Sequence, residues 1–211
     1  MNQNFVIRIL LYIAMLVMAL YFVYVLIPRK KQATPPKTHI PVQVEYLNTD
    51  KHIDEALLYC DSLGYRTDFA ILIDLAPHSG NYRFFGFNLE TKDTLIKGLV
   101  AHGHCKITEN RFAQFSNTIG SNCSSLGHYS VGSKYNGSFG TSYKLHGLDS
   151  ANSNALSRYI VLHSHSCIPD EEWEDDICQS EGCPTVSPNV LEQLMPYLDN
   201  LRKPVLLWIY D

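Results

Sequence analysis

The sequence predicts a mainly β domain, a β-sandwich or open barrel with one or two helices packed outside it, preceded by an N-terminal transmembrane helix. The domain is predicted by short apolar runs with the period of strands, which recur from residue 69 to residue 210 among few segments of helical spacing. The membrane helix is predicted by residues 9–27, which carry no charged side chain and are long enough to cross a bilayer core.

The N-terminal apolar segment is expected to be an uncleaved anchor. It is longer than the apolar core of an ordinary signal peptide, and no small-residue cleavage site follows it. The basic run at residues 29–31 favours a cytoplasmic position for the domain that follows. We expect residues 1–31 to form the anchor and residues 32–49, which are rich in proline, to form an extended linker. The domain itself would occupy residues 50–211.

The elements of the domain follow from local signals. Asp50 is expected to cap a short amphipathic helix that Gly64 ends, and Ser187 with Pro188 begins a second helix that runs to about residue 200. Residues 102–143 are rich in Gly, Ser, Asn and Thr and predict a long stretch of loops with short strands. Strands are expected at residues 69–75, 82–89, 94–101, 143–147, 158–163 and 204–210.

Composition limits the possible partners. The chain has 211 residues and a net charge of −4, so it has no basic face with which to neutralise nucleic-acid phosphates. It contains six cysteines, more than an ordinary intracellular chain of this size. Cys167 and Cys178 flank an acidic insert and could form a disulfide, and Cys105 and Cys123 are a second possible pair. The sequence leaves the connectivity open, including the state of Cys60.

A cysteine and a histidine stand out as candidates for covalent catalysis. Cys183 lies between Gly182 and Pro184, which places it on a bend rather than inside a helix or a central strand. His163 ends the apolar run at residues 159–162. An imidazole that accepts a thiol proton generates the thiolate nucleophile needed for acyl transfer.

The pattern His163-Ser164, followed by Ser180-Glu181-Gly182-Cys183, resembles the active-site motif of the murein L,D-transpeptidase catalytic domain family. The resemblance covers roughly residues 66–210. Two positions depart from it: Thr185 stands where the more widespread motif has Arg or Asn, and His163-Ser164-His165 replaces the usual His-Gly-Ala. Further matching pieces, in order, are residues 100–103, 115–117, 124–127, 135–137, 145–148 and Arg158.

The resemblance implies a role for each of these residues. Cys183 would be the nucleophile, His163 the general base, the backbone carbonyl of Ser164 the group that fixes the imidazole, and backbone N–H groups around Gly182 the oxyanion hole. Candidate substrate contacts are His146, Arg158, Ser180 and His165. For Arg158 a structural role is an equal alternative, for His146 a structural hydrogen-bonding role is the favoured one, and Ser180 is expected mainly to stabilise the bend.

The resemblance also implies a substrate and a location. The substrate would be a peptidoglycan stem peptide, from which D-alanine is released as a cross-link forms, and no cofactor or metal is needed. With water as acceptor, the same site would be an L,D-carboxypeptidase or hydrolase. The domain would lie on the periplasmic side of the inner membrane, against the orientation that the basic run at residues 29–31 favours.

Two other classes of function compete with this one. His102, His104, His163 and His165 alternate along two strands and could share faces, which would suit a zinc-dependent envelope hydrolase. The spacing matches no common zinc pattern, and Cys183 would then have no role. The second alternative is a non-catalytic murein-binding module.

Overall fold

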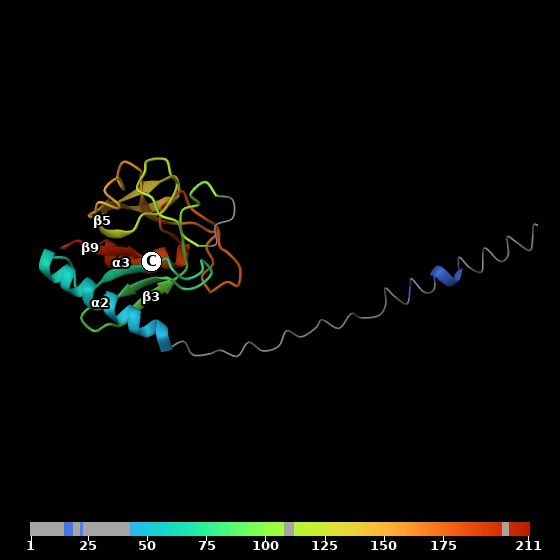
Figure 1. Cartoon of the computed structure of the whole chain (residues 1–211), viewed down its shortest axis with the longest axis horizontal. Coiled ribbons are helices and arrows are strands. Elements are labelled where there is room, and N and C mark those ends of the chain that lie inside the picture. Colours follow the sequence, from blue (N-terminus) through green and yellow to red (C-terminus); the bar gives the residue numbers. More distant parts are fainter. Residues whose placement is uncertain (1–14, 19–21, 23–42, 108–111, 200–202) are drawn as a thin grey trace, which may run out of the picture. The chain divides into compact units, whose positions relative to one another are not determined.

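The computed structural model describes residues 15–18, 22, 43–107, 112–199 and 203–211 (Figure 1). The chain divides into two compact units, Met1–Pro41 and Val42–Asp211, and the second contains the folded domain. Within the described residues, no helix is long and apolar enough to cross a membrane. This finding corrects the predictions of a transmembrane helix, of membrane attachment and of an inner-membrane location. In residues 9–27 helix is described only at residues 15–18 and 22, and the rest of that segment lies outside the described residues.

The first helix of the domain, α2 (Gln43–Leu63), begins before the predicted cap at Asp50. No Gly or Pro interrupts residues 43–63, so nothing in the backbone stops the helix from including part of the expected linker. It ends as predicted, because Gly64 has a φ of +72° and the amide of Tyr65 donates to the carbonyl of Cys60 at 2.9 Å.

The strands of the described residues form one nine-stranded sheet in the order β3-β2-β1-β9-β5-β6-β7-β8-β4. β3 and β4 stand at opposite ends of this order, yet only Leu99 separates them in the chain. The sheet must therefore curl until its two ends meet, which confirms the predicted barrel-like, mainly β architecture. The strands are β1 (Ala70–Asp74), β2 (Phe84–Phe87), β3 (Thr94–Gly98), β4 (Val100–Ala101), β5 (Gly127–Gly137), β6 (Gly140–Gly147), β7 (Val161–Ser164), β8 (Thr185–Val186) and β9 (Val205–Tyr210).

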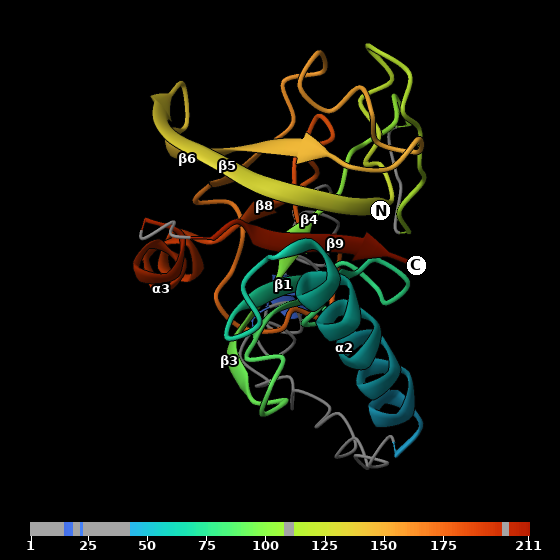
Figure 2. The same cartoon turned by 90° about the vertical axis from the view of Figure 1, so that its left-hand side faces the viewer.

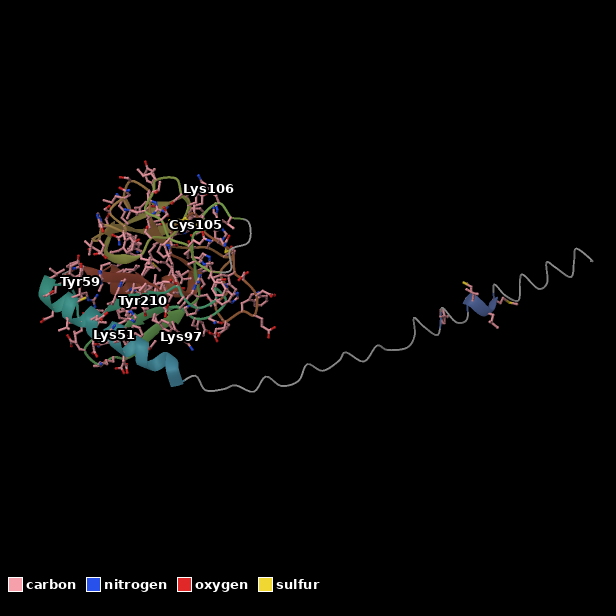
Figure 3. The ribbon with its side chains drawn as sticks, viewed as in Figure 1. Lys51, Tyr59, Lys97, Cys105, Lys106 and Tyr210 are labelled. Atoms are coloured by element: carbon pink, nitrogen blue, oxygen red, sulfur yellow. A yellow bond between two sulfur atoms is a disulfide. The ribbon has the colours of Figure 1, made fainter. Side chains whose placement is uncertain are left out.

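Both faces of the central strands are buried, as expected for the parallel pair β1 and β9. Ile71 and Ile73 of β1 point into the main core inside the curled sheet, whereas Ala70 and Leu72 point outward, beneath α2. Figure 2 shows α2 lying against the β1–β9 part of the sheet. Tyr59 of α2 and Tyr210 of β9 are labelled on this side of the domain in Figure 3.

The second helix, α3 (Pro188–Leu198), closes the main core. The hydroxyl of Ser187 accepts a hydrogen bond from the amide of Val190 at 3.2 Å and Pro188 is the first helical residue, as predicted. The buried face of the helix packs into the interior of the barrel through Val190, Leu191, Leu194 and Leu198.

The two suggested disulfides are both formed. Cys105 is bonded to Cys123 and Cys167 to Cys178, while Cys60 and Cys183 are free. The first disulfide ties together the two arms of the loop-rich stretch before β5. The second closes the acidic insert between β7 and β8.

Candidate active site

The pairing of β7 with β8 brings the two ends of the motif together. These strands are parallel neighbours, with His163 in register with Thr185, so Cys183 lies only two residues before the strand that flanks the histidine. Cys183 and His163 line one cavity of about 560 Å³. Its other principal lining residues are His104, Tyr135, Phe139, Ser142, Arg158, Tyr159, His165, Ser180, Glu181 and Thr185.

The bend that carries the cysteine is fixed by hydrogen bonds to Ser180. Its hydroxyl donates to the carbonyl of Cys183 at 2.7 Å and accepts from the amide of Gly182 at 3.1 Å. Gly182 has a φ of +112°, and an added Cβ would lie 2.6 Å from the carbonyl oxygen of Cys123. Only glycine therefore fits this position without strain, and Ser180 has the bend-stabilising contacts expected of it.

The imidazole of His163 is held on both sides. Its Nδ1 lies 3.1 Å from the carbonyl oxygen of Ser164, so Nδ1 carries the proton and Nε2 presents its lone pair. The hydroxyl of Thr185 lies 3.0 Å from that Nε2, and the ring of Phe139 stacks on the imidazole with centroids 4.6 Å apart. Burial, aided by the neighbouring His165, lowers the pKa of His163 below its ordinary value of 6.5.

The thiol of Cys183 is half-buried, and its Sγ lies 3.7 Å from the carbonyl oxygen of Tyr159. Burial raises the pKa of Cys183 above its ordinary value of 9.0, although a backbone hydrogen bond from Val161 and the charge of Arg158 oppose the rise. A raised thiol pKa beside a lowered imidazole pKa means that both groups are neutral at pH 7. The arrangement suits a histidine that acts as a general base rather than a preformed thiolate–imidazolium pair.

Arg158 lines the cavity, but its guanidinium is engaged by the loop before β5. Nη1 donates to the carbonyl of Ser116 at 2.8 Å and to the hydroxyl of Ser125 at 2.6 Å. Nη2 donates to the hydroxyl of Ser121 at 3.3 Å and to the carbonyl of Cys123. These contacts favour the structural role that the sequence left open for Arg158.

Two other sequence candidates take different positions. His165 lines the cavity beside Phe139, and its Nδ1 accepts from the amide of Cys167 at 3.1 Å. His146 is on β6 opposite Ser130, is not among the residues that line the cavity, and packs against Gly132. The structure therefore brings His165 to the site and leaves His146 outside the cavity.

The acidic insert is bound to the segment at residues 78–82. Glu171 accepts from the hydroxyl of Tyr82, Glu172 from the amide of the same residue at 3.0 Å, and Asp176 contacts the imidazole of His78 at 2.5 Å. Of residues 167–178, which the disulfide encloses, only Cys178 lines the cavity. The insert is thus anchored beside the site, and the carboxylates of Glu171, Glu172 and Asp176 are occupied by neighbouring groups.

The histidines of the suggested zinc site have other partners. Nδ1 of His102 lies 2.7 Å from the guanidinium of the fully buried Arg83. Nδ1 of His104 accepts from the amide of Lys106 at 2.8 Å, and its Nε2 contacts the side-chain amide of Asn122. In the part of the chain that the structure describes, no group of three His, Cys, Asp or Glu side chains could hold a metal ion. The donor set does not fit zinc.

Sequence reasoning missed three side chains at the site. Thr185 was noted only as a departure from the motif, and Phe139 and Tyr159 were not considered. Thr185 could have been found from strand periodicity, because residues 183 and 185 lie on the same face of an extended chain. Phe139 is at the tip of the β5–β6 hairpin, and no local signal shows that this tip reaches His163.

The fold and the cavity define a mainly β protein that presents a bent Cys loop and a strand-end His to one pocket. The family model described as the L,D-transpeptidase catalytic domain matches residues 48–210, and the chain belongs to this family. Membership supports an activity that modifies peptidoglycan. No match was found among curated proteins.

Two solved structures have distant similarity to the chain. One is the L,D-transpeptidase (residues 123–326) from Xylanimonas cellulosilytica, with 14% identity, a TM-score of 0.41 and coverage of 72% of this chain and 68% of that one. The other is the helical cell shape determining protein Pgp2 (K307A mutant) from Campylobacter jejuni. It has 11% identity, a TM-score of 0.43 and coverage of 77% of this chain and 56% of that one.

Proposed function

We propose that the protein is a cysteine-dependent acyltransferase that acts on peptidoglycan stem peptides. Cys183 attacks the carbonyl between diaminopimelate and the terminal D-alanine of a tetrapeptide stem, D-alanine leaves, and an amine of a neighbouring stem resolves the thioester into a cross-link. The observation that carries the proposal is that Cys183 and His163 line one cavity in a chain of the L,D-transpeptidase catalytic domain family.

The proton steps follow from the hydrogen bonds of His163. Because Nδ1 is bonded to the carbonyl of Ser164, Nε2 is the nitrogen that can accept the thiol proton. The electron pair that remains on Sγ forms the bond to the substrate carbonyl carbon. The imidazolium then returns the proton to the amine of the departing D-alanine, and the second half-reaction removes a proton from the acceptor amine in the same way.

The oxyanion of the tetrahedral intermediate would be stabilised by backbone N–H groups of the Cys183 bend. The amide of Gly182 donates to the hydroxyl of Ser180, so that donor holds the bend. The amide of Cys183 itself is therefore our principal candidate for the oxyanion donor. Loss of one such donor typically costs about 10²–10³ in rate.

A mass measurement on the full chain tests the proposal. A disaccharide-tetrapeptide is incubated with the wild type and with the Cys183→Ala variant. We expect the wild type to release D-alanine and form a cross-linked dimer, and the variant to do neither. Release of D-alanine with only the tripeptide product would identify an L,D-carboxypeptidase that uses water as acceptor. Equal turnover by the variant would contradict the nucleophile assignment.

A covalent probe tests the same site without a natural substrate. We expect a carbapenem, which acylates nucleophilic thiols of this kind, to add its mass to the wild type. The adduct is expected to be lost in Cys183→Ala and to form much more slowly in His163→Ala. A protein with no adduct and no turnover, which still binds murein, would instead be a non-catalytic binding module.

A further inference from the structure

Thr185 contacts both the imidazole of His163 and the backbone of Cys183. It begins β8, in register with His163, and only 4% of its surface is exposed. Its Oγ1 lies 3.0 Å from Nε2 of His163 and 3.3 Å from the carbonyl oxygen of Cys183. One hydroxyl therefore contacts the imidazole and the residue that carries the thiol.

A hydroxyl has a single hydrogen, so Thr185 can donate to only one of these two acceptors at a time. The two contacts therefore correspond to the two protonation states of His163. In the neutral imidazole, Nε2 is an acceptor and Thr185 donates to it. In the imidazolium, Nε2 is a donor, Oγ1 of Thr185 accepts from it, and the hydroxyl hydrogen turns to the carbonyl of Cys183. The two distances allow the change between these states with no more than a turn of the hydroxyl hydrogen.

We propose that Thr185 is a positioning residue whose hydroxyl holds the imidazole of His163 in both of its protonation states. The proposal rests on the Cys183–His163 chemistry of the proposed function. In the step concerned, the hydroxyl of Thr185 first turns from Nε2 of His163 to the carbonyl of Cys183, which frees the Nε2 lone pair. The proton that leaves Sγ of Cys183 then ends on Nε2, and the electron pair stays on sulfur. The charge of the pair is unchanged in total, and no other reactant is needed.

The hydroxyl stabilises the two states unequally. A hydrogen bond from a charged imidazolium is roughly twice as strong as one between neutral groups. Thr185 therefore favours the protonated ring and partly offsets the burial that lowers the pKa of His163. Without the hydroxyl, this pKa should fall further, by about one unit, and the weaker base should take up the thiol proton more slowly.

Two substitutions separate this role from simple packing. Thr185→Val keeps the branched shape that suits a strand and removes the hydroxyl, whereas Thr185→Ser keeps the hydroxyl and removes the methyl group. If Thr185 only packs, the Thr185→Val variant should keep the wild-type His163 pKa and kcat/KM, and the Thr185→Ser variant should lose activity. A hydroxyl role requires the reverse order.

The experiment is an NMR titration of the His163 imidazole in the full chain, with the pH profile of kcat/KM for a disaccharide-tetrapeptide as a second measurement. For Thr185→Val we expect the pKa to fall by about one unit and the maximal rate to fall about tenfold. Thr185→Ser should match the wild type in both. A Val variant that titrates and turns over like the wild type, or a Ser variant as impaired as Val, would overturn the proposal.

Other ionisable groups face the ring, but both variants leave them unchanged. They are His165 beside the imidazole and, as further residues that line the cavity, His104, Tyr135, Arg158, Tyr159, Glu181 and Cys183. If Thr185→Val does not fold, Thr185→Ala also removes the hydroxyl and must lower the pKa in the same direction. The titration needs no substrate, so a wild type without turnover would contradict the proposed function and still leave the role of Thr185 measurable.

Discussion

At the scale of single residues, burial favours the uncharged forms of Cys183, the proposed nucleophile, and of His163, the proposed base. Burial acts on Cys183 and His163 in opposite numerical directions, because it disfavours the charged form of each: the thiol pKa rises and the imidazole pKa falls. A neutral thiol is a poor target for unspecific electrophiles. With its pKa raised above 9.0, the thiolate of Cys183 is a minor form at neutral pH.

The raised thiol pKa predicts slow alkylation at neutral pH. The reaction of Cys183 with iodoacetamide should increase about tenfold per pH unit up to a pKa above 9.0, because only the thiolate reacts. Unfolding in urea removes the burial, so the same cysteine should then react faster at pH 8. The rate is measured by peptide mass spectrometry without reductant, so that the two disulfides stay intact.

Cys60 provides an internal control for this experiment. It is fully buried, and burial raises its pKa to about 12, so it should be alkylated more slowly than Cys183 at every pH. If Cys183 reacted at pH 8 as fast in the folded protein as in the unfolded chain, burial would not raise the pKa of its thiol.

The bend at Cys183 was predictable because its causes are local. Gly182 and Pro184 exclude regular structure around the cysteine, and the apolar run before His163 marks a strand end. The contacts of Arg158 were not predictable. Its partners lie 33 to 42 residues away in the chain, and they are loop residues with no distinctive sequence signal. Sequence alone gave no reason to choose between a substrate carboxylate and these carbonyl and hydroxyl acceptors of the loop.

At the scale of elements, one arginine holds the loop before β5 against the bend of the cysteine. Arg158 lines the cavity, and its guanidinium donates hydrogen bonds to the loop at residues 116–125. The Cys105–Cys123 disulfide links the same loop to the segment that follows β4. The carbonyl of Cys123, which Arg158 contacts, also lies against Gly182. The position of the bend therefore depends on the order of this loop.

Replacing Arg158 should loosen that loop. In Arg158→Met the acceptors of four hydrogen bonds lose their donor, and each buried acceptor left unpaired costs about 1–3 kcal/mol before solvent reaches it. We expect faster hydrogen exchange at residues 116–125, and reduced turnover with a similar KM. Arg158→Lys should not restore the loop, since a single ammonium cannot span the four acceptors. If Arg158 instead bound the substrate carboxylate, KM would rise in both variants and exchange would stay unchanged.

At the scale of the whole molecule, the site exists because a nine-stranded sheet closes on itself. β7 and β8, which bring His163 and Thr185 together, lie near the end of the sheet that finishes with β4. The strand periodicity of the sequence predicted most of these strands, and it predicted the two packed helices. The order of the strands could not be predicted, because pairings such as β1 with β9 join residues from opposite ends of the domain and leave no local pattern.

The single residue between β3 and β4 should therefore control the stability of the closed barrel. Leu99 is fully buried and packs with Ala101, Ile168 and Ile177, so it also attaches the acidic insert to the sheet. Leu99→Ala should lower the free energy of unfolding by about 2–5 kcal/mol, measured by urea denaturation. The matched control is Leu58→Ala, on the solvent side of α2, where the side chain is 71% exposed and the change should be close to zero. Similar losses in the two variants would mean that the barrel does not depend on this junction. A loss confined to Leu99→Ala, with slower carbapenem acylation of Cys183, would connect closure of the sheet to the geometry of the site.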